Sequence, residues 1–349
     1  MKKTRLLIAI TSIAMLLLSA CYAHPRNENQ TSDTIVPGFT INYIDVGQAD
    51  SALVVCDGRT MLIDGGNVAD SDLIYTFLKN HNISNLDYII ATHAHEDHVG
   101  GLAGALNYAT VGVAFSPVTE YDSKAFANFV KYLGEQNVSI TIPNAGDTFK
   151  LGSADVMILG PINPSEEPNN TSIVLRIVYG ATSFLFTGDC ERPVEQDILD
   201  AGYDLSATVL KVGHHGSDTS TTYPFLREIM PQYAVISCGV DNPYGHPDEN
   251  TMSRLRDADV IVYRTDMQGT ITCISDGETV SITTEKNAGA QTNPAESDSD
   301  EAYYIGNINT HKFHRPSCSG LPIEKNRVVF NTREDALNAG YDSCGTCRP

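Results

Sequence analysis

Apolar and polar residues follow strand-like and helix-like periods along most of the chain. Alternating runs at residues 39–46, 52–56 and 60–64 predict three strands before any helix. Further strands are expected at 86–91, 111–115, 138–142, 148–151, 154–159, 172–179, 183–186, 207–212, 233–237, 260–263, 270–274 and 280–284, and helices near 73–78, 102–106, 125–133, 194–199, 222–229 and 249–256. This order predicts an α/β fold of two sheets with helices outside.

The first residues have the pattern of a secretory signal. A positive start precedes an apolar stretch at residues 6–18, which is too short to remain as a membrane span. The end of this stretch, Leu18-Ser19-Ala20-Cys21, resembles the lipobox of bacterial lipoproteins. We therefore predict a lipoprotein signal peptide at 1–20, lipidation of Cys21 and a polar tether at 21–37, which together would hold the protein outside the cytoplasm on the cell membrane. An ordinary signal peptide that releases a secreted protein is the alternative.

Composition divides the remaining chain into two units. Residues 38–285 carry the strand and helix patterns of the main domain. Residues 286–302 contain almost no large apolar side chains and predict a flexible acidic linker. The segment 303–349 is a separate unit, small enough to need a covalent or metal staple.

Charge is unevenly distributed between these units. The formal net charge is -20, and residues 22–302 contain 39 Asp and Glu against 14 Lys and Arg, whereas residues 303–349 contain 4 against 6. An acidic body repels polyanions, which counts against a high-affinity nucleic-acid binder. It leaves room for a hydrolase that meets its substrate slowly.

The segment Thr92-His93-Ala94-His95-Glu96-Asp97-His98-Val99-Gly100-Gly101 directly follows the strand predicted at 86–91. In an extended chain His93, His95 and Asp97 project to one side, and a turn after Asp97 would return His98 to the same point. Three imidazoles and one carboxylate suit zinc, manganese or iron better than magnesium or calcium. A histidine-bearing loop without a metal is the alternative interpretation.

Two later motifs also follow strands: Thr187-Gly188-Asp189 and Gly213-His214-His215-Gly216-Ser217. Together with Ile44-Asp45-Val46-Gly47-Gln48-Ala49-Asp50-Ser51 and the His93–His98 motif, they resemble the metallo-β-lactamase-fold hydrolases, in particular the soluble domain attached to the DNA-uptake channel protein ComEC. The resemblance implies a four-layer αββα sandwich with two divalent metal ions, zinc or manganese, at its edge.

The resemblance also implies roles for individual residues. His93 and His95 would hold the first metal, Asp97 and His98 the second, and Asp189 would bridge them. Of His214 and His215, one would complete the second site while its neighbour supports it. His246, in Tyr244-Gly245-His246-Pro247, would donate a proton to the leaving group or contact a phosphate oxygen, unless it is simply a packed loop histidine. Asp64 would orient a ligand, and Asp97 belongs to the catalytic centre.

One departure concerns the first metal. Many members of the superfamily have a further histidine before the Gly-Asp motif, where this chain reads Asn169-Asn170-Thr171-Ser172. The first metal is therefore short of a protein ligand, so it is weakly held, completed by water or substrate, or absent. Asn170 could contribute an oxygen from its supporting position.

The C-terminal unit has its own metal motif. His314-x3-Cys318 and Cys344-x2-Cys347 have the spacing of a structural zinc site, and the unit resembles the metal-binding module of the Ada DNA-repair protein. His311 in place of His314, or a disulfide in place of the metal, is the alternative. The remaining Cys56, Cys190, Cys238 and Cys273 lie in or beside apolar runs and are expected to be buried thiols, although a disulfide among them stays open.

Taken together, these residues predict a secreted metal-dependent hydrolase that cleaves a phosphodiester in DNA or nucleotides with a metal-bound hydroxide. The alternatives are a cell-wall phosphodiesterase of the phosphorylcholine-esterase type, a lactonase, or a lipoprotein that binds DNA or envelope polymer without turnover. The basic residues of the C-terminal unit make DNA binding there a hypothesis. No protein partner can be inferred.

Overall fold

The computed structural model describes residues 38–293, 303–316, 318–345 and 347. The predicted signal peptide, the lipidated Cys21, the tether and residues 294–302 of the linker lie outside the described residues. Within the described part of the chain, no helix has both the length and the apolar character needed to cross a membrane.

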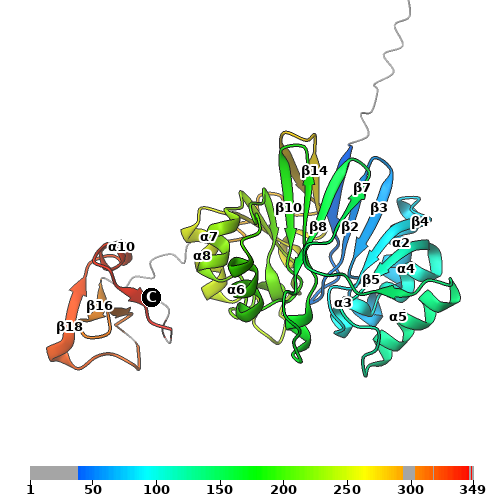
Figure 1. Ribbon diagram of the computed structural model, residues 1–349. Helices are drawn as coiled ribbons and strands as arrows, with labels where there is room; N and C mark the ends of the chain where they lie inside the picture. Colours follow the sequence, from blue (N-terminus) through cyan, green and yellow to red (C-terminus); the bar gives the residue numbers. More distant parts are fainter. Residues whose placement is uncertain (1–37, 294–302, 317, 346, 348–349) are drawn as a thin grey trace, which may run out of the picture. The chain divides into compact units, whose positions relative to one another are not determined.

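The first of two large sheets contains the strands from the beginning and the end of the main domain (Figure 1). Its order is β15-β14-β1-β2-β3-β4-β5-β6. The strands are β1 (Phe39–Tyr43), β2 (Ala52–Cys56), β3 (Arg59–Ile63), β4 (Asn85–Ile90), β5 (Thr110–Phe115), β6 (Ile140–Thr141), β14 (Ile271–Ser275) and β15 (Val280–Thr284). Strands β3 to β6 run parallel, and the remaining neighbours are antiparallel.

The second sheet is built from the middle of the domain in the order β13-β12-β11-β10-β9-β8-β7. Its strands are β7 (Thr148–Leu151), β8 (Ala154–Gly160), β9 (Val174–Tyr179), β10 (Thr182–Phe186), β11 (Val209–Lys211), β12 (Tyr233–Ile236) and β13 (Ile261–Arg264). Strands β10 to β13 are parallel. The loops that follow β3, β4, β10, β11 and β12 bring their polar residues to one edge of the sandwich, where the candidate site lies.

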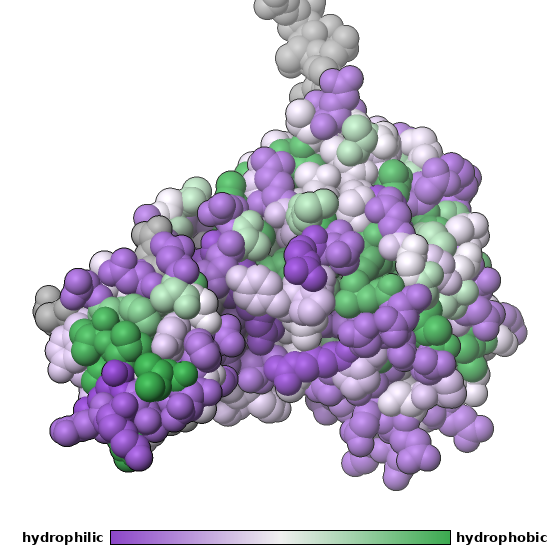
Figure 2. Space-filling model, turned by 60° about the vertical axis from the view of Figure 1, so that its left-hand side comes forward, coloured by the Kyte–Doolittle hydropathy of each residue, from purple (hydrophilic) through white to green (hydrophobic). Residues whose placement is uncertain are grey.

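Helices cover the outer faces of both sheets, which confirms the predicted αββα order (Figure 1). Apolar residues of the first three helices named below pack on the first sheet, and those of the next three pack on the second. The bounds are α2 (Ser71–Asn80), α4 (Leu102–Tyr108) and α5 (Lys124–Glu135), then α6 (Arg192–Ala201), α7 (Tyr223–Ile229) and α8 (Glu249–Asp257), with the short helices α3 (Glu96–Val99) and α9 (Thr265–Gln268) in loops. Polar side chains dominate the face seen in Figure 2.

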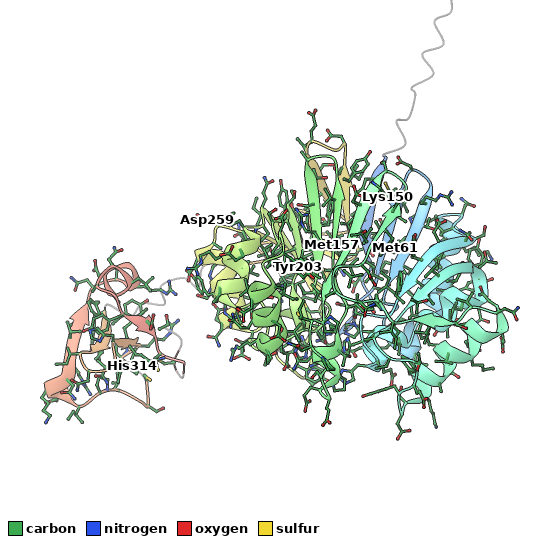
Figure 3. All side chains as sticks on the ribbon, viewed as in Figure 1. Met61, Lys150, Met157, Tyr203, Asp259 and His314 are labelled. Atoms are coloured by element: carbon green, nitrogen blue, oxygen red, sulfur yellow. The ribbon has the colours of Figure 1, made fainter. Side chains whose placement is uncertain are left out.

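The central core lies between the two sheets. The ring of Phe39 in β1 stacks on Phe184 in β10 and on Tyr179 at the end of β9, with centroids 4.8 Å and 5.1 Å apart. Met61 in β3 belongs to the same buried cluster, among the side chains that fill the sandwich (Figure 3). These contacts join residues from both halves of the chain, so the core holds the two sheets, and the loops at their edge, in a fixed relation.

The main domain extends beyond its predicted end at residue 285. Thr292 Oγ1 donates a hydrogen bond of 2.6 Å to the carbonyl oxygen of Val262, and Asn293 Nδ2 donates one of 3.0 Å to Met252. Arg256 also donates to Oδ1 of Asn293. The first residues of the predicted flexible linker are therefore fastened to β13 and α8, a feature that their low apolar content does not indicate.

The C-terminal module has a four-stranded sheet in the order β18-β16-β17-β19. The elements are β16 (Tyr304–Asn307), β17 (Lys312–His314), η4 (Glu324–Asn326), β18 (Arg327–Phe330), α10 (Arg333–Asn338) and β19 (Asp342–Ser343). Its apolar core is small, with Tyr304, Phe313 and Ala336 buried and Phe330 and Tyr341 packed against them. Such a core gives little stability by itself, so we expect the module to depend on its metal motif.

Replacing Phe184 by alanine tests the role of the central core. The ring is fully buried and stacked on Phe39, so we expect Phe184→Ala to lower the free energy of unfolding by about 3–5 kcal/mol. Chemical denaturation measures the loss. Ile142→Ala, at a residue about half exposed, is the control and should change stability little; equal effects of the two substitutions would contradict this account of the core.

Candidate metal centre

The His93–His98 segment places its ligands by bending, and not as the extended strand that the sequence predicts. Residues 92–95 form bends after β4, and Glu96 starts the one-turn helix α3, which carries Asp97 and His98. Nε2 of His93 then lies 3.0 Å from Nδ1 of His95, and the His98 ring lies 4.1 Å from the His93 ring. Asp97 and His98 join one cluster of possible metal ligands with Asp189 and His215, and His93 and His95 lie beside this second cluster.

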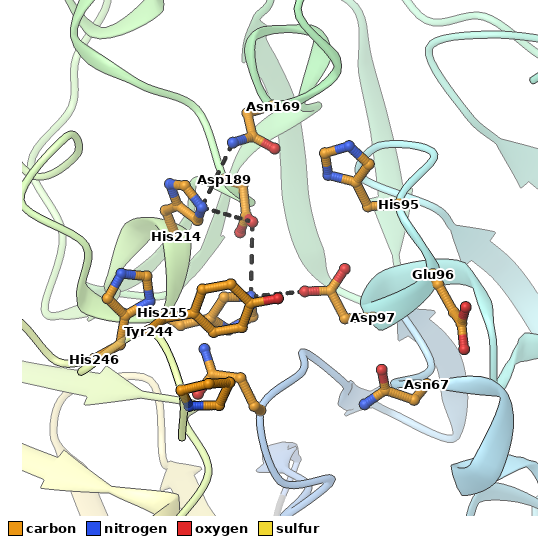
Figure 4. A pocket seen from close by; sticks show the side chains of 12 residues that line it. Asn67, His95, Glu96, Asp97, Asn169, Asp189, His214, His215, Tyr244 and His246 are labelled. Carbon is orange, nitrogen blue, oxygen red and sulfur yellow. Dashed lines mark hydrogen bonds and ion pairs between the residues drawn. The ribbon is translucent and has the colours of Figure 1, made fainter. Parts of the chain in front are cut away.

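The second cluster joins three loops. Asp97 and His98 follow β4, Asp189 follows β10 and His215 follows β11, and one donor atom from each lies within 4.8 Å of the others. Nε2 of His215 is 3.2 Å from Oδ2 of Asp97 and 3.6 Å from Oδ2 of Asp189, and Nε2 of His98 is 3.4 Å from Oδ1 of Asp189. Figure 4 shows His215 between Asp97 and Asp189, with dashed lines to both.

The unpaired atoms of this cluster fit a divalent metal. Nε2 of His98, Nε2 of His215 and Oδ1 of Asp189 are buried and have no hydrogen-bond partner among the described residues. Buried polar atoms without a partner are unfavourable, and a cation would satisfy all three. Two ligand atoms bound about 2.1 Å from one ion lie roughly 3 to 3.6 Å apart, close to the separations found here.

The same crowding shifts the pKa values. Burial opposes the charge on His98 and His215, but the surrounding carboxylates outweigh it: Asp189 and Asp64 raise the pKa of His98 well above its usual value, and Asp189 and Asp50 raise that of His215 to about 10. Burial also opposes ionisation of Asp97, yet His98 and His215 lower its pKa to about 2. Carboxylates that stay ionised beside protonated imidazoles make protons and metal ions competitors for this cluster.

His93 behaves differently, because its ring is buried with less compensation. Burial, reinforced by the neighbouring charge of His98, lowers the pKa of His93 well below its usual value. A neutral imidazole is the form that binds metal. His93 is therefore ready to ligate without losing a proton first.

Each imidazole of the second cluster has a buried aspartate beside its Nδ1 atom. Nδ1 of His98 donates to Oδ2 of Asp64 at 2.8 Å, and Asp64 also accepts from the backbone and hydroxyl of Thr92 at 2.8 Å and 2.7 Å. This is the orienting position that the sequence predicts for Asp64. Nδ1 of His215 donates to the carbonyl of Ser237 at 3.0 Å and lies 3.4 Å from Oδ1 of Asp50. Such partners fix the tautomer and strengthen the ligand.

Asp50 and its partner Lys211 were not predicted as site residues. Nζ of Lys211 is buried and lies 2.8 Å from Oδ2 of Asp50, so the lysine neutralises the carboxylate that faces His215. Asp50 belongs to the Gln48-Ala49-Asp50-Ser51 stretch that carries part of the family resemblance. The signal for Lys211 is a single charged residue inside the apolar run of β11.

The backbone at the site adopts unusual conformations. Asp64, His214 and His215 have φ of 57°, 51° and 54°, in the left-handed region that costs such residues on the order of 1 kcal/mol each. Hydrogen bonds hold the histidine loop there, from His214 N to Gly188 O at 3.1 Å and from Ser217 N to His214 O at 2.8 Å. Two successive left-handed residues send the neighbouring imidazoles to different partners.

Glycines allow the loops after β3 and β4 to touch. Gly65 N donates to His98 O at 2.7 Å, and Gly101 N donates to Gly66 O at 3.0 Å. A Cβ at Gly101 would collide with the carbonyl oxygen of Gly65. The glycine pairs therefore bring Asp64 within reach of His98.

His214 lies apart from the second cluster. Its Nε2 is 3.8 Å from Oδ2 of Asp189 and 3.5 Å from Nδ2 of Asn169, and its Nδ1 is 3.2 Å from the hydroxyl of Thr219. Oδ1 of Asn170, the oxygen that the sequence suggests for a metal, accepts a hydrogen bond of 3.1 Å from the backbone of Glu191. Asn169 lines the pocket instead.

An open pocket of about 670 Å³ leads to these ligands. His246 lies on its wall, with its ring 5.7 Å from that of His214 and 5.7 Å from that of Tyr244, which stacks on it. Burial, with the neighbouring His214 and His215, lowers the pKa of His246. The remaining lining residues are Gln48, Asn67, His95, Glu96, Asp97, Asn169, Asp189, His215 and Pro243.

The structure also gathers the four predicted ligands of the C-terminal module. The ligand atoms of His314, Cys318, Cys344 and Cys347 lie within 4.8 Å of one another, and Nδ1 of His314 is 3.4 Å from Sγ of Cys318. Gly320 N donates to Cys318 Sγ at 3.3 Å, a contact that supports a thiolate ligand. His311 is outside this cluster and packs on Tyr341 instead. Figure 3 labels His314 in the module.

Cys56, Cys190, Cys238 and Cys273 are buried free thiols, as their apolar surroundings predict.

Substituting Asp64 tests its control of the second cluster. Asp64→Asn removes the charge behind His98 and an acceptor for Thr92, so we expect metal affinity at this cluster to fall by about 10- to 100-fold. Titration of the metal-free full chain with Zn²⁺ or Mn²⁺ measures it. Asp87→Asn, at an aspartate paired with Arg59 on the same sheet, is the control; an equal fall in both variants would refute the specific role of Asp64.

A second prediction concerns the C-terminal cluster. Cys344→Ala removes one of four ligands, so the full chain should lose one equivalent of tightly bound zinc while the metal-dependent properties of the main domain persist. Metal analysis after gel filtration measures the stoichiometry. Cys190→Ala, at a buried thiol of the main domain, is the control and should retain the zinc. Unchanged zinc content in the Cys344 variant would rule out a site at these residues.

Comparisons with known proteins agree with this geometry. The C-terminal residues 290–349 match the metal binding domain of Ada. The chain is 31% identical to ComE operon protein 3 of Bacillus subtilis (strain 168) over 250 residues, 66% of this chain and 32% of that protein. It is 30% identical to competence protein ComA of Neisseria gonorrhoeae (65% and 31%) and 31% identical to recombination protein 2 of Haemophilus influenzae (67% and 29%).

The chain spans about a third of the length of these curated relatives. Residues 44–240, which contain the His93–His98 motif, Asp189 and both residues of the histidine pair, match the metallo-beta-lactamase superfamily. The αββα order and the buried cluster of possible metal ligands agree with this match. The chain therefore belongs to the metallo-β-lactamase superfamily.

Proposed function

We propose that the main domain is a metal-dependent phosphodiesterase that cleaves DNA or nucleotides. The observation that carries this proposal is the set of buried, unpaired donors on His98, His215 and Asp189 at the floor of an open pocket. Two ions bound at such a floor supply a water that is ionised at neutral pH and neutralise the phosphoryl oxygens. His93, His95, Asp97, His98, Asp189 and His215 are the residues that would hold them.

The charge of the pocket supports a reaction that depends on bound cations. Of the described residues that line it, none is lysine or arginine, whereas Glu96, Asp97 and Asp189 are acidic. Once the imidazoles at the floor bind metal in their neutral form, the floor has no cationic side chain to hold a phosphate. Substrate binding, and not only turnover, is expected to need the metal, and it should depend weakly on salt because few cationic side chains contact the backbone.

The loop after β12 supports a nucleotide substrate. Tyr244 is 70% exposed at the pocket and stacks on His246 at an interplanar angle of 23°. Asn242 braces this loop, since its Oδ1 accepts from His246 N at 3.0 Å and its Nδ2 donates to Gly239 O at 3.0 Å. An exposed ring on a braced loop suits stacking with an unpaired base, worth about 1–3 kcal/mol.

His246 would contact the reacting phosphate from the wall of the pocket. Its lowered pKa favours the neutral imidazole, so its role would be to donate one N–H hydrogen bond to a phosphate or leaving-group oxygen. The names of two relatives, a competence protein and a recombination protein, favour DNA.

Cleavage assays test this proposal. With Mn²⁺ or Zn²⁺, the full chain should cleave single-stranded DNA and bis-p-nitrophenyl phosphate. Asp97→Ala removes a metal ligand, so it should lower kcat/KM by at least about 100-fold, more than a substitution of a residue that only hydrogen-bonds to a ligand. Tyr244→Ala should raise KM for single-stranded DNA by about tenfold, because it removes the stacking ring. KM for an abasic oligomer should not change. Tyr223→Ala, at an exposed tyrosine outside the pocket lining, is the control.

Three outcomes would overturn the proposal. Equal cleavage by the wild type and Asp97→Ala would assign the activity to a contaminant. Hydrolysis of lactones or of choline phosphodiesters, with DNA left intact, would establish one of the other enzyme classes that this fold hosts. Metal binding without any turnover would identify a binding protein.

A further inference from the structure

The first pair of histidines needs another protein ligand. Nε2 of His93 lies 3.0 Å from Nδ1 of His95 and 3.9 Å from Oδ2 of Asp189, so His93 lies near both of the other residues expected at the first metal. The chain contains no histidine between His98 and His214. Since zinc takes about four ligands, the remaining position falls to another atom on this side of the pocket.

Asn169 occupies this side of the pocket. It belongs to η2 (Pro168–Thr171), and Figure 4 shows its side chain between those of His214 and His95. Nδ2 of Asn169 donates to Oε1 of Glu191 at 3.4 Å and lies 3.5 Å from Nε2 of His214. Because a carboxylate only accepts hydrogen bonds, the contact with Glu191 determines which end of the amide is the nitrogen.

The amide oxygen is consequently turned away from Glu191 and toward the side of His95 (Figure 4). Oδ1 of Asn169 is buried and has no hydrogen-bond partner among the described residues. A buried carbonyl oxygen without a partner is unfavourable. A cation bound by His93 and His95 would satisfy this oxygen.

The two residues next to this arrangement have other tasks. The oxygen of Asn170 already accepts a hydrogen bond from the backbone of Glu191, whereas the oxygen of Asn169 has no hydrogen-bond partner among the described residues. Nε2 of His214 can accept from Nδ2 of Asn169 while Nδ1 of the same ring donates to Thr219. In that tautomer His214 holds the amide in place, which accounts for its position apart from the second cluster.

We propose that Oδ1 of Asn169 is a ligand of the first metal, together with His93, His95 and Asp189, and that Glu191 and His214 position the amide. This assignment rests on the metal centre of the proposed function but not on its substrate. The two sites then differ chemically. The first has a neutral amide oxygen where the second has a further charged or imidazole ligand, so the first site should be the weaker one and should favour Mn²⁺ more than an all-imidazole site would.

Metal titration of the full chain tests the assignment. Bound ions are first removed with a chelator. The chain is then titrated with Mn²⁺, which binds weakly to the thiolates of the C-terminal cluster and so reports on the main domain. Electron paramagnetic resonance measures the free Mn²⁺ at each step. We expect two classes of site. Asn169→Ala should lower the Mn²⁺ affinity of the weaker class by about tenfold or more and leave the affinity of the stronger class unchanged. At limiting Mn²⁺, the spin-coupled signal of the metal pair should be lost.

Gain and control variants sharpen the test. Asn169→His restores an imidazole and should strengthen Zn²⁺ binding at the weaker site by about tenfold. Asn163→Ala, at an exposed asparagine that precedes η2 and donates to Asp197, should leave both affinities unchanged. Unfolding of the metal-free variants confirms that each is folded. His214→Ala should weaken the first site less than Asn169→Ala does and spare the second.

Two results would overturn the assignment. Unchanged affinity at both sites in folded Asn169→Ala would show that the amide is not a ligand. A loss of one site in His214→Ala as complete as that caused by His215→Ala would make His214 a ligand itself. Because the measurement is binding, it stands apart from the cleavage assay, and a chain that binds both ions without cleaving DNA would contradict only the proposed substrate.

Discussion

Asp189 is the buried charge on which the site depends. Its carboxylate lies 3.4–3.9 Å from imidazole nitrogens of four histidines, which come from the loops after β4 and β11. An ionised carboxylate at this depth is stable only if it is compensated. Both loops must therefore deliver nitrogen atoms to one point, which explains why the histidine loop tolerates two left-handed residues and why glycine pairs join the loops after β3 and β4.

Local motifs could be predicted from the sequence, but contacts between side chains that only the folded chain brings together could not. The positions of His93, His95, Asp97 and His98 follow from one short segment, and most strands follow from their apolar periods. The distinction between Asn169 and Asn170 depends on which side of one 3-10 turn each occupies, a difference of a single residue that periodicity does not resolve. The pairing of Asp50 with Lys211 joins residues far apart in sequence, so no local pattern reports it.

Charge and shape in the main domain are consistent with each other. Under the proposed function, the acidic body and the absence of lysine or arginine from the described pocket lining would both leave the phosphate to cations at the floor. Tyr244 would then supply contact without charge at the rim. Such a division would keep affinity for a polyanion low except where an ion is bound, which would favour brief encounters over stable complexes.

The sheet order has a consequence for how the chain reaches this structure. Strand β1 pairs with β2 on one side and with β14 on the other, so Phe39 faces Ser275 across more than 200 residues of intervening chain. Until β14 has been synthesised, one edge of β1 is open to pairing with another molecule. The domain therefore cannot complete its first sheet until β14 and β15 have emerged, and long-range closure of this kind slows folding and makes the unfinished chain prone to aggregation.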